Sequence, residues 1–165
     1  MEFVNVYNLK LQIDKECEIY DATVKSAEKA AEIINLVFEL NSEAVEKVGV
    51  ITLTANHKVA GIHIIAVGSN NWAHIKTRDA FVPAMLNNSD MIILFHNHPS
   101  GDPRPSVQDI FITETIVRFG DQFDTKVFDH VIVAGDKYHS MRDNGDVDFT
   151  GKMAGINLSK FFENN

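Results

Sequence analysis

The chain has 165 residues, of which 45% are hydrophobic and 23% charged, so we expect one globular domain over residues 1–165. Its formal net charge of −8, from 23 acidic and 15 basic residues, argues against nucleic acid as a partner. The single cysteine, Cys17, excludes an internal disulfide and agrees with a reducing cytoplasm, and the chain has neither a signal-peptide pattern nor a long apolar run, so we expect no membrane segment.

The first half of the chain predicts a strand, a helix and a hairpin. Residues 4–13 alternate loosely and indicate a strand. From Thr23 the apolar spacing changes to three and four residues, which predicts an amphipathic helix to about Leu40, capped by Thr23 or Ser26. Two apolar runs rich in β-branched residues, at 48–54 and 59–67, then predict a β-hairpin.

The second half of the chain predicts two helices and three strands. Residues 77–87 have a helical pattern, although Pro83 fits poorly outside a first turn. Residues 91–95 form an apolar run typical of a short buried strand. The helix predicted at 106–119 has Gly120 as a candidate C-cap, and its expected apolar face is Val107, Ile110, Phe111 and Val117. Strands at 126–133 and 138–141 complete an α/β (α+β) class with a mixed sheet and packed helices.

The stretch HNHPSGDPRPSVQD, residues 96–109, carries the clearest chemistry. In an extended chain residues i and i+2 point the same way, so His96 and His98 can converge at the end of a strand. If the proline-rich loop folds back, Asp109 can supply a third ligand for zinc, which leaves one tetrahedral position open, as in catalytic zinc sites. A simpler interpretation is that Ser106 and Asp109 only cap the helix, and one serine could do both.

Taken whole, the motif H-x-H-x7-S-x-x-D resembles that of the JAB/MPN zinc metalloproteases, and HNHPSGDPRPSVQD is most similar to the bacterial RadC-like branch. The segments EKVGVITLTANHKV and VFDHVIVAGDKYHSMRDNG also resemble that branch, so the likeness covers about residues 24–145 and leaves 146–165 unassigned. The resemblance implies the JAB/MPN, cytidine-deaminase-like fold. The chain looks like a compact prophage-type member without the N-terminal helix-hairpin-helix region of longer relatives.

The resemblance also implies roles for individual residues. His96, His98 and Asp109 match the three zinc ligands, and Ser106 matches the serine that helps to hold the oxyanion. Glu46 aligns with the general base, with Glu43 as its nearest rival. His130, in FDHVIV, matches a family position, where it is either a partner of the ligands or a satisfied core histidine; the second interpretation is favoured here.

The function that follows from this resemblance is a zinc-dependent peptidase or isopeptidase acting on a peptide or an isopeptide-linked protein. Two alternatives stay open: a metal-dependent protein associated with nucleic acid or DNA repair, and a non-catalytic MPN scaffold. The charge of −8 disfavours the first alternative, and the intact ligand set disfavours the second. The sequence leaves the substrate and the oligomeric state undetermined.

Overall fold

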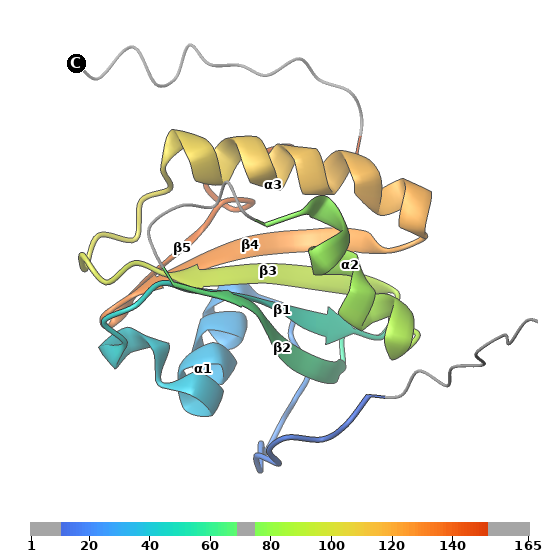
Figure 1. Cartoon of the computed structure of the whole chain (residues 1–165), viewed down its shortest axis with the longest axis horizontal. Helices are drawn as coiled ribbons and strands as arrows, with labels where there is room; N and C mark the ends of the chain where they lie inside the picture. The colour runs from blue at the N-terminus through green and yellow to red at the C-terminus, as the bar shows by residue number, and fades with distance from the viewer. Residues whose placement is uncertain (1–10, 69–74, 152–165) are drawn as a thin grey trace, which may run out of the picture.

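The computed structural model of the protein describes residues 11–68 and 75–151, which form three layers (Figure 1). The middle layer is a five-stranded sheet in the order β2-β1-β3-β4-β5. Helix α1 covers one face of this sheet, and α2 and α3 cover the other (Figure 1). The bounds are α1 Ala27–Phe38, β1 Lys47–Leu53, β2 Val59–Val67, α2 Thr77–Leu86, β3 Met91–Asn97, α3 Val107–Gly120, β4 Lys126–Ala134 and β5 Lys137–Ser140, with 3-10 turns at Leu40–Ser42 and Asp121–Phe123.

The sheet is mixed, and its one parallel pair places α3. Strand β1 pairs antiparallel with β2 and β3, and β4 pairs antiparallel with β5. Strands β3 and β4 are parallel, so the chain must cross from one end of the sheet to the other between them, and α3 makes that crossing. The carboxyl end of β3 and the beginning of α3 therefore lie at the same end of the sheet (Figure 1).

The alternation of side chains along β3 sorts its residues between the two faces. Ile93 and Phe95 pack in the cluster that includes α1, whereas Ile92 and Leu94 pack in the cluster that includes α2 and α3. Because successive side chains of a strand point to opposite faces, the α2–α3 face continues with residue 96 and the α1 face with residue 97. The strand thus carries a histidine toward α3.

Most predicted elements agree with the structure. Ser26 caps α1 by accepting a hydrogen bond from the Lys29 backbone N–H at 3.2 Å, so Ser26 and not Thr23 is the cap. The hairpin, the buried strand, the helices and the two closing strands all lie within a few residues of their predicted bounds. The strand predicted at 4–13 falls mainly outside the described residues, and its part at 11–13 is wrong because no strand forms there.

Two details of the predicted helices are wrong. Pro83 lies well inside α2, where burial of Ala80, Phe81 and Ala84 compensates for the backbone hydrogen bond that proline cannot donate. Gly120 is not a left-handed cap but the last residue of α3. A Cβ atom at Gly120 would lie 2.8 Å from the carbonyl oxygen of Thr125, so close packing explains this glycine.

The apolar face predicted for α3 is only half right. Ile110 and Val117 are buried, but Val107 and Phe111 are 54% and 60% exposed. The buried stripe of α3 instead includes two polar side chains, those of Asp109 and Thr113. A helix that buries polar groups beneath it needs partners for them, and those partners come from the end of β3 and from β4.

Beyond the predicted closing strand, the first residues of the unassigned tail join the core. Val147 and Phe149 are 7% and 8% exposed and pack in the cluster with α2 and α3. Asp146 contacts His139 of β5 at 2.6 Å. Within residues 11–68 and 75–151, none of the helices combines the length and the apolar character needed to cross a lipid bilayer.

Candidate metal centre

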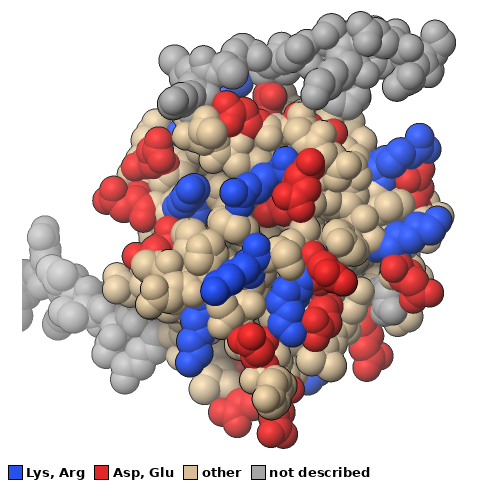
Figure 2. Space-filling view, turned by 180° about the vertical axis from the view of Figure 1, so that it is seen from behind, with Lys and Arg blue, Asp and Glu red and all other residues tan. Residues whose placement is uncertain are grey.

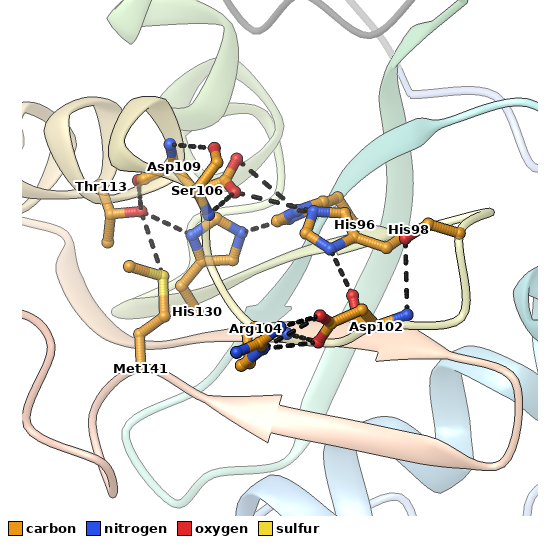
Figure 3. Close-up of polar contacts among 10 residues, drawn as sticks. His96, His98, Asp102, Arg104, Ser106, Asp109, Thr113, His130 and Met141 are labelled. Carbon is orange, nitrogen blue, oxygen red and sulfur yellow. Dashed lines mark hydrogen bonds and ion pairs between the residues drawn. The ribbon is translucent and has the colours of Figure 1, made fainter. Parts of the chain in front are cut away.

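Three of the predicted site residues come together where β3 ends and α3 begins. His96 is the second-to-last residue of β3, His98 directly follows the strand, and Asp109 lies in the first turn of α3. Figure 3 shows the three side chains pointing toward one another. The Nε2 atoms of the two histidines are 2.9 Å apart, and each lies 3.6 Å from a carboxylate oxygen of Asp109. These residues form a group that could hold a metal ion.

The donor atoms of this group fit a tetrahedral metal. Ligand atoms at about 2.0–2.1 Å from zinc are separated from one another by roughly 3.3 Å, and the observed separations of 2.9 and 3.6 Å lie on either side of that value. The Oδ1 atom of Asp109 is buried and finds no hydrogen-bond partner among the described residues. A buried carboxylate oxygen without a donor is costly unless a cation satisfies it.

The contacts of His98 make Nε2, and not Nδ1, the ring nitrogen that can coordinate a metal. Its Nδ1 atom lies 2.8 Å from the backbone carbonyl oxygen of Asp102, which can only accept a hydrogen bond, so Nδ1 carries the proton. Burial lowers the pKa of His98, but Asp109, the Asp102 carbonyl and the charge of Glu46 outweigh burial and raise that pKa. Since Nδ1 keeps its own proton, the second proton that this raised pKa favours in the metal-free chain would lie on Nε2, the atom that faces Asp109 and that a metal would occupy instead.

The other two ligand candidates are held in the charge states that metal binding requires. Burial, followed by the neighbouring His130, lowers the pKa of His96 well below its ordinary value, so this imidazole is neutral near pH 7. Burial raises the pKa of Asp109, but the contacts with His98, His96 and Ser106 outweigh it and hold the carboxyl well below its usual range. A neutral imidazole beside a carboxylate is the ligand chemistry of zinc.

Ser106 has the capping role that its spacing suggested. Its side-chain oxygen accepts a hydrogen bond from the Asp109 N–H at 3.1 Å, and Asp109 Oδ2 accepts one from the Ser106 N–H at 2.6 Å. This reciprocal pair fixes the Asp109 carboxylate in the first turn of α3. Ser106 is itself an exposed residue, and Figure 3 shows it next to Asp109.

Glu46 lies beside the ligand group. In the antiparallel ladder of β1 and β3, Val48 pairs with His96, and the Lys47 N–H donates to the Asn97 side chain at 2.7 Å. Glu46 precedes Val48 by two residues, and because residues i and i+2 of an extended chain point to the same side, we expect its side chain on the face of the sheet that carries His96. The charge of Glu46 is accordingly among the causes that raise the pKa of His98. Glu43, the rival candidate, forms an ion pair with Lys47.

Asn97, the middle residue of the His-x-His pair, was not singled out in the sequence. It is 1% exposed and points to the opposite face of the sheet from His96. Its Oδ1 atom accepts the Lys47 N–H, and its Nδ2 atom donates to the carbonyl oxygen of Val45 at 3.2 Å. Asn97 thereby fastens the segment that carries Glu46 to the strand that carries the histidines.

His130 of β4 is the second residue whose role the sequence did not reveal. It is fully buried, and its Nε2 atom lies 2.8 Å from His96 Nδ1 (Figure 3). Its Nδ1 atom lies 2.6 Å from the hydroxyl group of Thr113 in α3. Burial lowers the pKa of His130 to about 4, so the ring is neutral near pH 7. The interpretation of His130 as a core histidine is therefore incomplete, because it contacts a ligand candidate directly.

Comparison with known families agrees with this geometry. The model of the RadC-like JAB domain matches residues 24–146, which include the sheet, all three helices and the group of His96, His98 and Asp109. The chain belongs to the RadC-like JAB family. The mixed sheet with three flanking helices is the fold that membership in this JAB/MPN family implies.

Individual relatives in the family are also similar to the chain. A UPF0758 protein of Caldanaerobacter subterraneus is 36% identical over 119 residues, which are 72% of this chain and 51% of the relative. A UPF0758 protein of Desulfitobacterium hafniense is 42% identical over 96 residues, 58% of this chain and 42% of the relative. One from Methanosarcina barkeri is 33% identical over 107 residues, 65% and 47% of the two chains. The chain thus spans about half the length of the curated relatives it matches.

Charges of both signs are interspersed on one face of the molecule (Figure 2). On the face shown in Figure 2, lysine and arginine side chains alternate with aspartate and glutamate. Proteins that bind the phosphate backbone non-specifically present a basic strip or groove, because each lysine or arginine releases a condensed counterion. The described residues on this face offer no such strip.

Proposed function

We propose that this chain is a zinc-dependent peptidase or isopeptidase, which hydrolyses an amide bond in a peptide or an isopeptide-linked protein. The observation that carries the proposal is the convergence of two imidazoles and a buried carboxylate whose Oδ1 atom has no hydrogen-bond donor among the described residues. Glu46, whose charge acts on His98, and Ser106, which caps the helix of Asp109, are our candidates for the two further groups that amide hydrolysis needs. The single cysteine, Cys17, fits a reducing compartment, and we propose the cytoplasm.

The proposed roles follow from the chemistry of each side chain. When bound, zinc supplies Lewis acidity and makes water a nucleophile near neutral pH. His96, His98 and Asp109 would hold the ion, and the half-buried Glu46 would take a proton from the attacking water and return it to the leaving amine. The exposed hydroxyl of Ser106 would donate a hydrogen bond to the oxyanion that develops on the carbonyl.

The two alternative functions have less support. A scaffold has no use for a complete ligand set, and here all three ligand candidates converge. A nucleic-acid-associated role would benefit from a basic surface, but the net charge is −8 and the charges in Figure 2 are interspersed. Binding of a peptide substrate makes no such demand on charge.

The test uses the Glu46→Gln variant, because glutamine keeps the shape of the side chain but cannot accept the proton. Wild-type chain is loaded with zinc, its metal content is measured by elemental analysis, and hydrolysis is followed on a panel of peptides and isopeptide-linked lysine conjugates. We expect one zinc per chain in both proteins and a rate about 10²–10⁴ lower in Glu46→Gln.

Glu43→Gln is the matched control, since Glu43 is three residues away and is paired with Lys47. We expect this variant to keep both the metal and the activity. If Glu46→Gln hydrolyses substrate at the wild-type rate and Glu43→Gln does not, the general base is Glu43. A wild-type chain that takes up no zinc would refute the metal-dependent mechanism itself.

A further inference from the structure

A chain of buried hydrogen bonds runs behind His96, away from the side that faces His98 and Asp109 (Figure 3). Thr113 Oγ1 lies 2.6 Å from the backbone carbonyl oxygen of Asp109 and 2.6 Å from His130 Nδ1. The other ring nitrogen of His130 lies 2.8 Å from His96 Nδ1. All three side chains are fully buried, so water does not compete for these contacts.

The position of each proton in this series of hydrogen bonds follows from how many N–H and O–H groups it contains. A carbonyl oxygen has no proton, so the contact between Thr113 and the Asp109 carbonyl must use the single hydroxyl proton of Thr113. Two oxygens 2.6 Å apart without a proton between them would repel, so this proton cannot point to His130 instead. The proton in the contact between Thr113 and His130 must therefore come from His130 Nδ1.

The proton of His96 is fixed in turn by His130. A neutral imidazole has one N–H group, so His130 with its proton on Nδ1 offers only an electron pair at Nε2. The 2.8 Å contact between the two rings then requires the proton of His96 to be on Nδ1. That tautomer leaves the electron pair of His96 at Nε2, the atom that faces His98 and Asp109.

We propose that Thr113 and His130 are positioning residues that fix His96 in the Nδ1-protonated tautomer and aim its Nε2 electron pair at the metal. Polar groups behind the ligating histidines of a metal site typically fix the tautomer in this way. Here the group is a second histidine from the neighbouring strand, held in turn by the helix that carries Asp109. The backbone carbonyl of Asp102 likewise keeps a proton on Nδ1 of His98, so in both histidines Nε2 is the atom left for the metal.

Because this assignment rests on the proposed metal site, the experiment has one readout that needs no metal. In the metal-free wild-type chain, two-bond ¹⁵N–¹H NMR correlations identify the tautomer of each histidine. We expect the Nδ1–H form for His96 and His130. The Nε2–H form of His96, or a mixture of both forms, would overturn the inference whether or not the chain binds zinc.

The second readout is zinc affinity, measured by competition with a chromophoric chelator. His130→Phe removes the acceptor for His96 Nδ1 but fills the buried volume, and we expect zinc binding to weaken about 10–100-fold. His130→Gln, which offers a carbonyl oxygen to His96 and an amide donor to Thr113, should recover part of that loss.

Thr113→Val keeps the proposal testable if His130 variants do not fold. Valine has the shape of threonine without the hydroxyl, so His130 loses the acceptor that fixes its own tautomer. We expect a smaller loss of zinc affinity in the same direction, and a mixture of His96 tautomers in the NMR spectrum. Thr113→Ser, which keeps the hydroxyl, should behave like the wild type.

Thr115→Val is the matched control on the same helix. The Thr115 hydroxyl also donates to the carbonyl four residues before it, that of Phe111, at 2.8 Å, but Thr115 is only half-buried and makes no hydrogen bond to a histidine among the described residues. This variant should change neither the tautomers nor the zinc affinity. Equal zinc affinity in Thr113→Val, Thr115→Val and the wild type would show that the hydrogen-bond chain is only structural. Absence of zinc binding by the wild type would refute the proposed function. The tautomers of His96 and His130 would then be decided by the NMR measurement on the metal-free chain alone.

Discussion

Helices α2 and α3 begin with the same local device and differ in what surrounds it. In α2 the Asp79 carboxylate accepts a hydrogen bond from the Lys76 N–H at 3.1 Å, and in α3 Asp109 accepts one from the Ser106 N–H at 2.6 Å. The Asp79 side chain is 39% exposed and lies beside Arg78, whereas that of Asp109 is 1% exposed and faces two histidines. Capping alone explains Asp79 fully. It leaves the buried Oδ1 atom of Asp109 unexplained, and the proposed metal site would account for that atom.

The largest effect that follows from this comparison is loss of the metal from Asp109→Asn. Asparagine can still accept the capping hydrogen bond, but it has no charge and is a poor zinc ligand. Since loss of a mere outer partner of a ligand costs about 10–100-fold in metal affinity, we expect a loss beyond about 100-fold here. Zinc competition against a chelator measures it. Asp79→Asn, at the equivalent position of α2, should bind zinc like the wild type, and equal affinities of the two variants would break the comparison.

A second effect concerns the two serine caps, Ser106 of α3 and Ser26 of α1. Both side chains accept a hydrogen bond from the third residue of their helix, at 3.1 and 3.2 Å. Only Ser106 borders the ligand group, so Ser106→Ala should lower turnover about 10²–10³-fold while zinc content stays at one per chain. Ser106→Thr should recover part of the rate. Ser26→Ala should leave turnover unchanged. A normal rate in Ser106→Ala would show that Ser106 only caps the helix and takes no part in hydrolysis.

The smallest effect is the one that the two serines share. Removal of a serine cap typically costs about 1 kcal/mol in the free energy of unfolding, and we expect this in the metal-free forms of both Ser26→Ala and Ser106→Ala. Urea unfolding followed by circular dichroism measures it. A domain of ordinary stability, about 5–15 kcal/mol, stays almost wholly folded after such a loss. A hundredfold fall in turnover therefore cannot come from unfolding.

The sequence predicted the parts of the site that are close together in the chain. His96, His98, Ser106 and Asp109 lie within fourteen consecutive positions, residues 96–109, and their spacing alone suggested a strand end, a loop and a capped helix. Glu46 came from the resemblance and not from any local feature. Whether it comes near the histidines depends on the register of β1 against β3, which pairs Val48 with His96 and which no local pattern contains.

The sequence could not predict the partners behind the ligands. His130 meets His96 because β4 is parallel to β3 and next to it, and the two residues are 34 positions apart. The hydrophobic spacing put Val107 and Phe111 on the buried face and did not single out Thr113, which is the residue that is buried. Hydrophobic spacing assumes an apolar core beneath the helix, but the core beneath the first turns of α3 is a polar site, so the buried face is rotated toward Asp109 and Thr113.

Because His96 and Asn97 point to opposite faces of the sheet, the candidate metal centre can form in only one register of β3. A strand that slips by one residue exchanges its two faces completely. In β3 such a slip would turn an asparagine toward Asp109 and a histidine toward the loop before β1. The same slip would remove His96 from the ligand group and break the hydrogen bonds of Asn97 to Val45 and Lys47. The three ligand candidates converge only when β3 is in the correct register. Binding of a metal at this group would therefore show that the strands have paired correctly.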